Sequence, residues 1–245
     1  MLIFCYNDRE MNAPFNRLAI DPLLRTDPWF AHLPTPVQTA MIAAGMSKAL
    51  PAGRTLFHQG GEPSGLHAIL QGELHITGIA ASGDEVIMAI VRPFEWVGFL
   101  TCLDGLSHAY SGTASGDTTV YSINPKAVAS IFEVDVATYR LLELPELNAA
   151  RKLADYVVSN IGMPLAKRVA ARLTDLGRWG YGPASGPVAS LENVNQEDLA
   201  MSVHASRQKV NAILRDFSAS GWIEVGYCRI RVIDVEAVER FARPD

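Results

Sequence analysis

Four side chains between residues 206 and 217 could read the edges of DNA base pairs. Arg207, Gln208 and Asn211 carry guanidinium or amide groups that can form paired hydrogen bonds with guanine or adenine. Ala212 is expected on the same helical face and could contact the methyl group of a thymine. Nearby polar groups could fix this helix on the DNA backbone, and we expect phosphate contacts from Asn195, Ser206, Lys209 and Arg215.

These side chains need a helix with one polar face, and this stretch of the chain predicts two short helices around a tight turn. Asn195 can cap the first helix, and Ser206 can cap the second. His204 lies in the turn, where it tolerates a positive φ better than a β-branched residue would. Gly221 suits the position after the second helix. The buried stripe of that helix is expected at Val210, Ile213, Leu214 and Phe217.

Two short strands after the second helix are expected to form a small wing. Ile223–Val225 and Arg229–Ile233 can pair as a hairpin across Gly226-Tyr227. A further helix is predicted over 164–178, followed by a loop rich in Gly, Pro and Ser between 180 and 186. The pattern predicts a winged helix-turn-helix, and an ordinary helical hairpin with a solvated polar face stays open as the alternative.

Charge is unevenly distributed along the chain. The 245 residues carry a formal net charge of −5, which is unusual for a protein that binds DNA. Residues 1–145 hold 8 Lys and Arg against 14 Asp and Glu, whereas residues 146–245 hold 13 against 12. The acidic excess therefore lies in the N-terminal part, and a local basic surface for phosphate remains around Arg207.

Short β-prone runs separated by turn residues dominate the chain between Leu50 and Ile123. Strands at this spacing predict an antiparallel barrel or sandwich. Residues 21–50 before this region are predicted to be helical, and a short helix is predicted from Pro125 to Phe132 after it. The expected strands are Thr55–His58, Leu66–Leu70, Glu73–Ile79, Glu85–Val91 and Thr118–Ile123.

A longer helix is predicted over residues 137–162, with apolar residues spaced three and four apart as in a short coiled coil. Pro145 should kink or restart this helix, and Gly162-Met163-Pro164 should end it at a hinge. Packing of the helix on its own domain is the alternative to dimerisation. The positions of the seam are Leu147, Ala150, Ala154, Val157 and Ile161.

The order of these units resembles that of the Crp/Fnr family of bacterial transcription regulators. The resemblance is carried by DPWFAHLP at 27–34, LPAGRTLFHQGGEPSGLHAILQGELHI at 50–76, PLAKRVAARL at 164–173 and HASRQKVNAILRDFSASGWIEV at 204–225. It implies an α+β fold with an N-terminal antiparallel β-roll, a jelly roll of the cyclic-nucleotide-binding type. A long dimerisation helix and a C-terminal winged helix-turn-helix would follow.

The resemblance also implies a division of the chain and a set of partners. An N-terminal extension would cover residues 1–24, the β-roll sensor domain 25–136, the dimerisation helix and hinge 137–163, and the DNA-binding domain 164–245. The implied protein is a homodimer that binds a near-palindromic operator in double-stranded promoter DNA through the helix 206–217. RNA polymerase is the further partner implied.

The cassette that binds cyclic AMP in members of the family is altered here. The matching stretch is GFLTCLDGLSHAYS at 98–111. Phe99 replaces a carboxylate for the ribose, and His108-Ala109 stands near the Arg-Ser pair for the cyclic phosphate. Because an apolar ring cannot accept hydrogen bonds from ribose hydroxyls, and a neutral histidine substitutes poorly for a guanidinium, cyclic AMP is not expected as effector. The positions of the effector pocket correspond to Gly98, Phe99, Leu100, His108, Ala109, Tyr110, Leu153 and Ala154.

Other sensor chemistries can be compared with the residues available. An iron–sulfur cluster with four thiolate ligands is excluded, because the chain has three cysteines, Cys5, Cys102 and Cys228. A redox-sensing thiol at Cys102 stays open, as does haem, which needs one axial histidine. A surface or packing role is the alternative for the histidine candidates, His58, His67, His75 and His108.

An enzyme and a protein-binding module are the competing functional classes. A β-barrel with histidines suggests a cupin-like metalloenzyme, but the motifs HxH, HExxH, GxSxG, GxxxxGK and GxGxxG are absent from the sequence, and no metal site is predicted. A module without DNA binding would leave Arg207, Gln208 and Asn211 without a role. A transcription regulator is therefore favoured, and an enzyme is not expected.

A cytoplasmic location without membrane contact is expected from the start of the chain and from its apolar runs. MLIFCYNDRE lacks the basic region of a signal peptide, and the longest apolar run, Val86 to Val91, is too short to span a membrane. Met11 could be an alternative start to Met1. The loop at 182–190 corresponds to a polymerase contact in relatives, although its composition is equally that of a plain connector.

Overall fold

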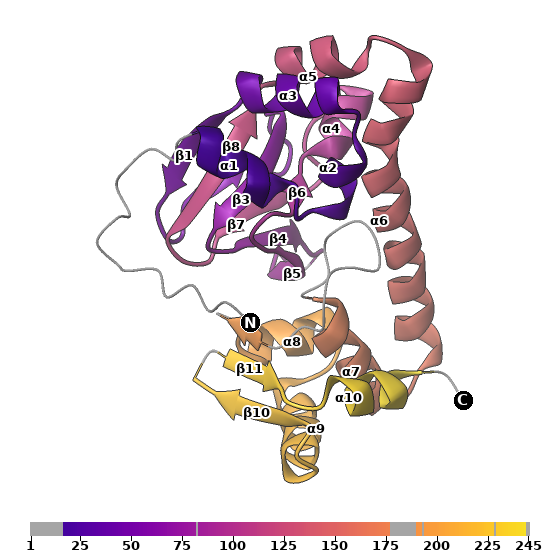
Figure 1. The fold of residues 1–245 in the computed structure, drawn as a ribbon. Coiled ribbons are helices and arrows are strands. Elements are labelled where there is room, and N and C mark those ends of the chain that lie inside the picture. The colour runs from indigo at the N-terminus through magenta and orange to yellow at the C-terminus, as the bar shows by residue number, and fades with distance from the viewer. Residues whose placement is uncertain (1–16, 82, 177–189, 193, 228, 244–245) are drawn as a thin grey trace.

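The computed structural model describes residues 17–81, 83–176, 190–192, 194–227 and 229–243. Figure 1 shows a larger N-terminal unit, a long helix along its side and a smaller C-terminal unit below, so that the protein has the expected α+β architecture. Several predicted features lie outside the described residues: the two candidate start residues, Cys5, Cys228, residues 1–16 of the N-terminal extension, and nearly all of the loop at 182–190.

The N-terminal unit is built on two antiparallel sheets. The first has the strand order β1 (Met46–Leu50), β8 (Thr118–Ile123), β3 (Leu66–Gln71) and β6 (Trp96–Val97). The second has the order β2 (Thr55–Phe57), β7 (Ser111–Ala114), β4 (Leu74–Ile79) and β5 (Glu85–Val91). Helices α1 (Arg17–Leu24), α2 (Pro28–His32), α3 (Thr35–Ala44), α4 (Phe99–Asp104) and α5 (Pro125–Phe132) complete the unit.

Strand β3 shows why this sequence forms two core layers. Ile69 joins the cluster between the two sheets, while its neighbours on the strand point to the opposite face. That face packs against the helices, where Ile20 of α1 and Trp29 of α2 are also buried. The core of the N-terminal unit therefore begins at least as early in the chain as Ile20. The residues of β3 on the helix side are Leu66, Ala68 and Leu70.

The predicted strands are found, but three strands and one helix of this unit were missed. Residues 46–50 were expected to be helical, and they form β1 because Met46 to Leu50 pair in register with Ser122 to Thr118 of β8. Strand β7 carries small side chains, and at Gly112 an added Cβ would lie 2.7 Å from the Phe57 ring. Close packing selects small residues there, which hides the strand from the sequence pattern. The missed elements are β1, β6, β7 and α4.

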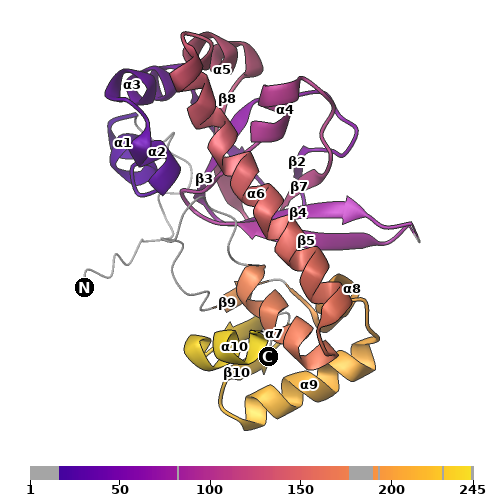
Figure 2. The same ribbon diagram turned by 90° about the vertical axis from the view of Figure 1, so that its right-hand side faces the viewer.

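Helix α6 (Val136–Gly162) runs from the N-terminal unit to the C-terminal unit (Figure 2). Of the prediction that Pro145 would kink or restart the helix, the restart is wrong, because α6 is one continuous helix. It ends at Gly162, and α7 (Leu165–Asp175) begins after Pro164, as the sequence predicted. Within the part of the chain that the structure describes, no helix has the length and apolar character required to cross a bilayer.

The C-terminal unit has one apolar core surrounded by helices and a three-stranded sheet. It comprises α7, β9 (Ser190–Glu192), α8 (Gln196–Ser202), α9 (Arg207–Ala219), β10 (Ile223–Gly226), β11 (Arg229–Val232) and α10 (Val235–Ala242). Strands β10 and β11 pair antiparallel, which confirms the wing, and β9 adds a third strand that the sequence did not predict. Helix α10 was also missed; the Asp234 side chain caps it by accepting from the N–H of Ala237.

Candidate nucleic-acid interface and effector cassette

A capping box sets the start of α8, the first helix of the predicted pair. The Asn195 side chain accepts from the N–H groups of Glu197 at 2.7 Å and Asp198 at 3.0 Å. The Asp198 carboxylate in turn accepts from the N–H of Asn195 at 2.9 Å. These reciprocal bonds satisfy backbone donors that a helix start leaves unpaired. The sequence anticipated this cap correctly.

The turn between α8 and α9 (Figure 1) follows the prediction residue by residue. His204 has a φ of +51°, and the N–H of Ala205 returns to the carbonyl of Ala200 at 3.0 Å. Ser206 is the N-cap of α9, and its hydroxyl oxygen accepts from the N–H of Lys209. The left-handed residue at 204 lets the chain reverse tightly, so that α9 leaves at a fixed angle to α8.

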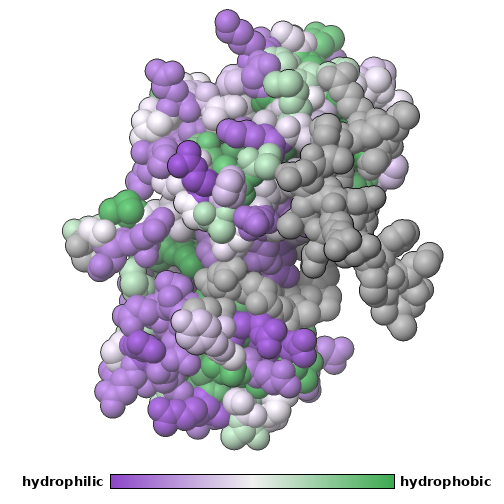
Figure 3. Space-filling view, turned by 90° about the vertical axis from the view of Figure 1, so that its left-hand side faces the viewer, coloured by the Kyte–Doolittle hydropathy of each residue, from purple (hydrophilic) through white to green (hydrophobic). Residues whose placement is uncertain are grey.

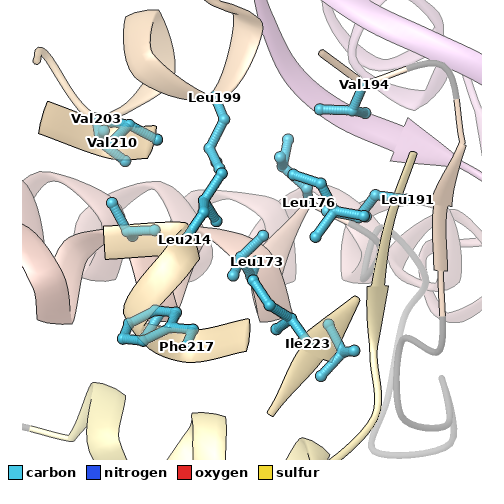
Figure 4. Packing of buried hydrophobic residues seen from close by; sticks show 14 of the residues in the cluster. Leu173, Leu176, Leu191, Val194, Leu199, Val203, Val210, Leu214, Phe217 and Ile223 are labelled. Carbon is cyan, nitrogen blue, oxygen red and sulfur yellow. The ribbon is translucent and has the colours of Figure 1, made fainter. Parts of the chain in front are cut away.

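Helix α9 is held by a buried stripe and by a closed C-terminus. Val210, Leu214 and Phe217 are buried in the core of the C-terminal unit (Figure 4), and Ile213 is partly buried against it. After Ser220, Gly221 takes a φ of +74°, and the N–H of Trp222 bonds to the carbonyl of Phe217 at 3.0 Å. This arrangement is a Schellman motif. Both ends and one face of the helix are therefore fixed.

The opposite face of α9 exposes most of the candidates for base contact. Arg207, Gln208 and Ala212 are exposed. Asn211 is half-buried, and its Oδ1 is buried without a hydrogen-bond partner among the described residues. A base contact by Asn211 therefore requires its Nδ2 group or a rotation of the side chain.

The candidates for phosphate contact surround this face. Lys209 and Arg215 are exposed, as are Ser206 and Asn195. The Asn195 oxygen is already engaged by two backbone N–H groups, so its amino group is what remains for a phosphate. The Ser206 hydroxyl keeps its proton for donation, because it acts as an acceptor in the cap.

In the cassette at 98–111, the position expected to carry a carboxylate is held by Phe99, which is part of the hydrophobic core. Phe99 is 3 % exposed, and its ring centroid lies 4.6 Å from that of Trp29 in an edge-on contact. Gly98 has a φ of +104°, and an added Cβ would lie 2.1 Å from the carbonyl oxygen of Gly65. This glycine is therefore required by the backbone itself, and Phe99 serves packing.

A chain of hydrogen bonds links the two buried histidines of the cassette region. The Ser64 hydroxyl lies 2.9 Å from Nε2 of His108 and 3.0 Å from Nε2 of His67. Nδ1 of His67 lies 2.8 Å from the Ser122 hydroxyl. The His108 ring stacks on Phe57 with centroids 4.3 Å apart. Burial lowers the pKa of both histidines, that of His67 to about 3, so both rings are neutral at pH 7.

Glu146 of α6 is part of this region and was missed by the sequence reasoning. Its carboxylate accepts from the backbone N–H of Leu100 at the start of α4, and burial raises its pKa. Burial also raises the pKa of Tyr110, with a further increase from the nearby Glu146 charge. A carboxylate within an otherwise amphipathic helix was the available signal, but its partner became evident only from the fold. Ala109 is exposed beside these groups.

The seam of α6 lies on the surface of the single chain. Leu147 is 51 % exposed, Val157 45 % and Ile161 83 %. The remaining seam residues Ala150 and Ala154 are also exposed, and so is Leu153; the two helix positions assigned to the effector pocket, Leu153 and Ala154, are therefore on the surface of the single chain. On the side of the molecule away from α6, hydrophilic side chains prevail over scattered apolar ones (Figure 3).

The candidate redox thiol, Cys102, has the properties of a packing residue. Burial raises the pKa of Cys102 to about 12, which keeps the thiol protonated and unreactive at neutral pH. His75 is buried, whereas His58 is exposed. Within the described residues, no three His, Cys, Asp or Glu side chains gather where they could hold a metal ion.

Comparisons with known proteins agree with this arrangement of domains. The family model for the cyclic nucleotide-binding domain matches residues 47–135, and the one for the Crp-like helix-turn-helix domain matches residues 167–241. The chain is 27 % identical to the CRP-like cAMP-activated global transcriptional regulator of Mycobacterium tuberculosis, over 79 % of this chain and 86 % of that protein. It is 26 % identical to the cyclic AMP receptor protein of Thermus thermophilus, over 78 % of this chain and 86 % of that protein.

Solved structures share the fold. FixK2 from Bradyrhizobium japonicum superposes with a TM-score of 0.67 at 14 % identity, covering 82 % of this chain and 98 % of that one. TTHB099 from Thermus thermophilus, a regulator of the CRP family, gives a TM-score of 0.58 at 21 % identity, covering 80 % and 96 %. With both domains matched in order, and with DNA-binding regulators rather than enzymes as relatives, the chain belongs to the Crp/Fnr family of transcription regulators.

Proposed function

We propose that this regulator acts as a homodimer that binds a near-palindromic operator, with one α9 helix in the major groove of each half-site. The observation that carries the proposal is the exposed polar face of α9 on a helix whose buried stripe and both ends are fixed. A rigid helix with Arg and Gln on its free face suits the major groove. RNA polymerase is the further partner we propose at the promoter.

Within this proposal the side chains of α9 divide into two groups. Arg207 reads a guanine through O6 and N7, Gln208 reads an adenine, and Ala212 contacts a thymine methyl group. Asn211 contributes through its Nδ2 group. The phosphate contacts that set the register come from Asn195, Ser206, Lys209 and Arg215.

Dimerisation is proposed through the apolar seam of α6. Leu147, Val157 and Ile161 would otherwise keep large apolar side chains in water. With Ala150 and Ala154 they form a seam whose positions are three and four residues apart, which suits a coiled-coil partner. A second copy of the same helix is the occupant with matching spacing. The two-fold symmetry of such a dimer matches a near-palindrome with half-sites about one helical turn apart.

The effector is proposed to be something other than cyclic AMP. A relative in Mycobacterium tuberculosis is described as cAMP-activated. In this chain, however, Phe99 is buried in the core, and neutral His108 is held by Ser64 and Phe57. These groups offer neither a carboxylate for the ribose nor a guanidinium for the cyclic phosphate. Haem is disfavoured as well, because both Nε2 atoms of the buried pair face Ser64.

Selection from random-sequence duplex DNA with the full-length protein tests the proposal. We expect enrichment of an inverted repeat, bound by a species of dimer mass in sedimentation velocity. Enrichment of a single unrepeated motif, or of none, would contradict it. Adding cyclic AMP should leave the affinity for the selected operator unchanged, whereas an increase of about tenfold or more would refute the effector part alone.

A further inference from the structure

A buried arginine joins the DNA-binding domain to the sensor. Arg172 of α7 is 7 % exposed. One of its terminal nitrogens donates to two carbonyl oxygens of strand β5, that of Ile87 at 2.8 Å and that of Met88 at 2.7 Å. Both acceptors belong to the sensor and lie more than 80 residues earlier in the chain. This guanidinium therefore bridges two domains.

The contacts around Arg172 make one continuous junction. Its guanidinium carbon lies 5.0 Å from the ring centroid of Tyr156 on α6, and the Tyr156 hydroxyl donates to the carbonyl of Ser202 at the end of α8, at 2.7 Å. The N–H of Ile90 on β5 donates to the carbonyl of Leu176 at 2.8 Å. The sensor strand, the long helix and the helix-turn-helix are thus linked through buried and half-buried groups.

Strand β5 lies at the edge of its sheet, and this explains why a polar side chain is needed there. An edge strand leaves backbone groups unpaired, and covering them with a domain requires partners for each buried group. Ile87 and Ile90 of β5 pack into the core of the DNA-binding domain, together with Leu173 and Leu176. Figure 4 shows Leu173 and Leu176 within this cluster. The apolar contacts provide most of the buried interface between β5 and the DNA-binding domain, and the hydrogen bonds of Arg172 fix how the two are oriented.

We propose that Arg172 is a positioning residue for operator binding. It locks α7, and with it α8 and α9, against β5, so that the sensor fixes the distance and angle between the two recognition helices of a dimer. The inference rests on the proposed function, since only a dimer on two half-sites has such a distance. Arg172 itself does not reach DNA in this role.

The positioning role can be distinguished from a role in the stability of the DNA-binding domain, because a stability role would weaken binding to a single half-site as well. The residues that hold α9 in its own domain, Val210, Leu214 and Phe217, form their core without the guanidinium. Removing the donors of Arg172 should therefore leave recognition of one half-site intact and change only the coupling of two half-sites. Methionine keeps much of the length and the apolar stem, whereas lysine keeps a charge with a single nitrogen.

The test measures how affinity depends on the spacing of the half-sites. The probes are duplexes that carry the operator selected by the wild-type protein, with spacers lengthened or shortened by one or two base pairs, and a duplex with one half-site. We expect wild type to prefer one spacing about tenfold or more, and Arg172→Met to flatten this profile with unchanged half-site affinity. Arg172→Lys and Tyr156→Phe should be intermediate, and the exposed Arg240→Met should match wild type.

Each outcome decides between the proposals. A wild-type protein without spacing preference would overturn the proposed dimer on two half-sites, and the inference with it. A preference that persists in Arg172→Met would overturn the inference alone. Should Arg172→Met lose half-site binding or its thermal transition, Tyr156→Phe decides, because it removes one hydroxyl only. An unchanged spacing profile in Tyr156→Phe would then overturn the positioning role.

Discussion

The indole Nε1 of Trp29 donates a hydrogen bond of 2.6 Å to the backbone carbonyl of Leu141. In a regular helix this carbonyl accepts from the N–H of residue 145, which here is Pro145 and has no N–H. Trp29 therefore supplies the donor that the proline removes. The contact explains why α6 passes Pro145 without a break, and it ties α2 to the helix proposed for dimerisation.

Replacing Trp29 tests this compensation. Trp29→Phe should lower the free energy of unfolding by about 1–3 kcal/mol, because the Leu141 carbonyl loses its partner in a largely buried position. Pro145→Ala restores an N–H at that place and should stabilise Trp29→Phe more than it stabilises wild type. Urea unfolding of the four proteins gives the coupling energy, expected at about 0.5–3 kcal/mol. A coupling of zero would show that the two residues act independently.

Features that depend on neighbouring residues could be predicted from the sequence, whereas the contact between Trp29 and α6 could not. The caps at Asn195 and Ser206, the positive φ at His204 and the wing depend on neighbours along the chain, and each was predicted correctly. The continuity of α6 depends on a residue 112 positions away from Leu141. Local rules for proline contain no information about such a partner.

Strand β1, Glu146 and Arg172 were missed because their partners are far away in the sequence. Strand β1 has few β-branched residues and becomes a strand because β8 pairs with it. Glu146 of α6 has its partner, the N–H of Leu100, on α4. Arg172 of α7 has its acceptors on β5, more than 80 residues earlier in the chain. In each case the decisive partner lies in another element.

Arg207→Ala is expected to relax sequence specificity at one position in each half-site. Loss of a paired contact with guanine should cost about 1–3 kcal/mol for the preferred operator and little for operators with another base at that position. Fluorescence anisotropy with operators substituted one base pair at a time measures this. Equal weakening on every sequence would instead assign Arg207 to a phosphate.

Lys209→Met should weaken DNA binding without changing sequence specificity. A lysine on a phosphate contributes charge without reading sequence, so affinity should fall uniformly on all operators. The slope of log affinity against log salt concentration should decrease by about 1 for each lysine removed from the DNA contact. Arg240→Met, an exposed change on α10, serves as the control. An unchanged slope for Lys209→Met would exclude a phosphate contact by Lys209.

Val157→Asp should dissociate the proposed dimer. A carboxylate in the seam would be buried beside its own copy at the two-fold axis, where like charges and desolvation both oppose association. Sedimentation velocity at micromolar protein should show the monomer mass. Ile79→Asp is the matched control, since Ile79 is 58 % exposed at the end of β4 and outside the seam. A dimer that survives Val157→Asp would place the interface elsewhere.

The buried His67 predicts a loss of stability in mild acid. Its pKa falls from 6.5 to about 3, first because the ring is buried, and further because the charge of Lys48 and that of His108, once protonated in acid, oppose a second positive charge nearby. Between these two pH values the unfolded chain binds a proton on this ring, and the native protein does not. The free energy of unfolding must therefore decrease as pH falls below 6.5, by about 2 kcal/mol at pH 5 from this group alone.

Urea unfolding of His67→Gln between pH 7 and pH 5 isolates this effect. Glutamine keeps polar atoms near Ser64 and Ser122 but does not titrate, so the dependence on pH should become flatter even if the variant is less stable throughout. The exposed His58→Gln serves as the control and should keep the wild-type slope. Because the slope, and not the absolute stability, is the quantity compared, any packing defect at residue 67 cancels. A slope in His67→Gln as steep as in wild type would mean that His67 is protonated in the native protein, and the neutral hydrogen-bond chain through Ser64 would be wrong.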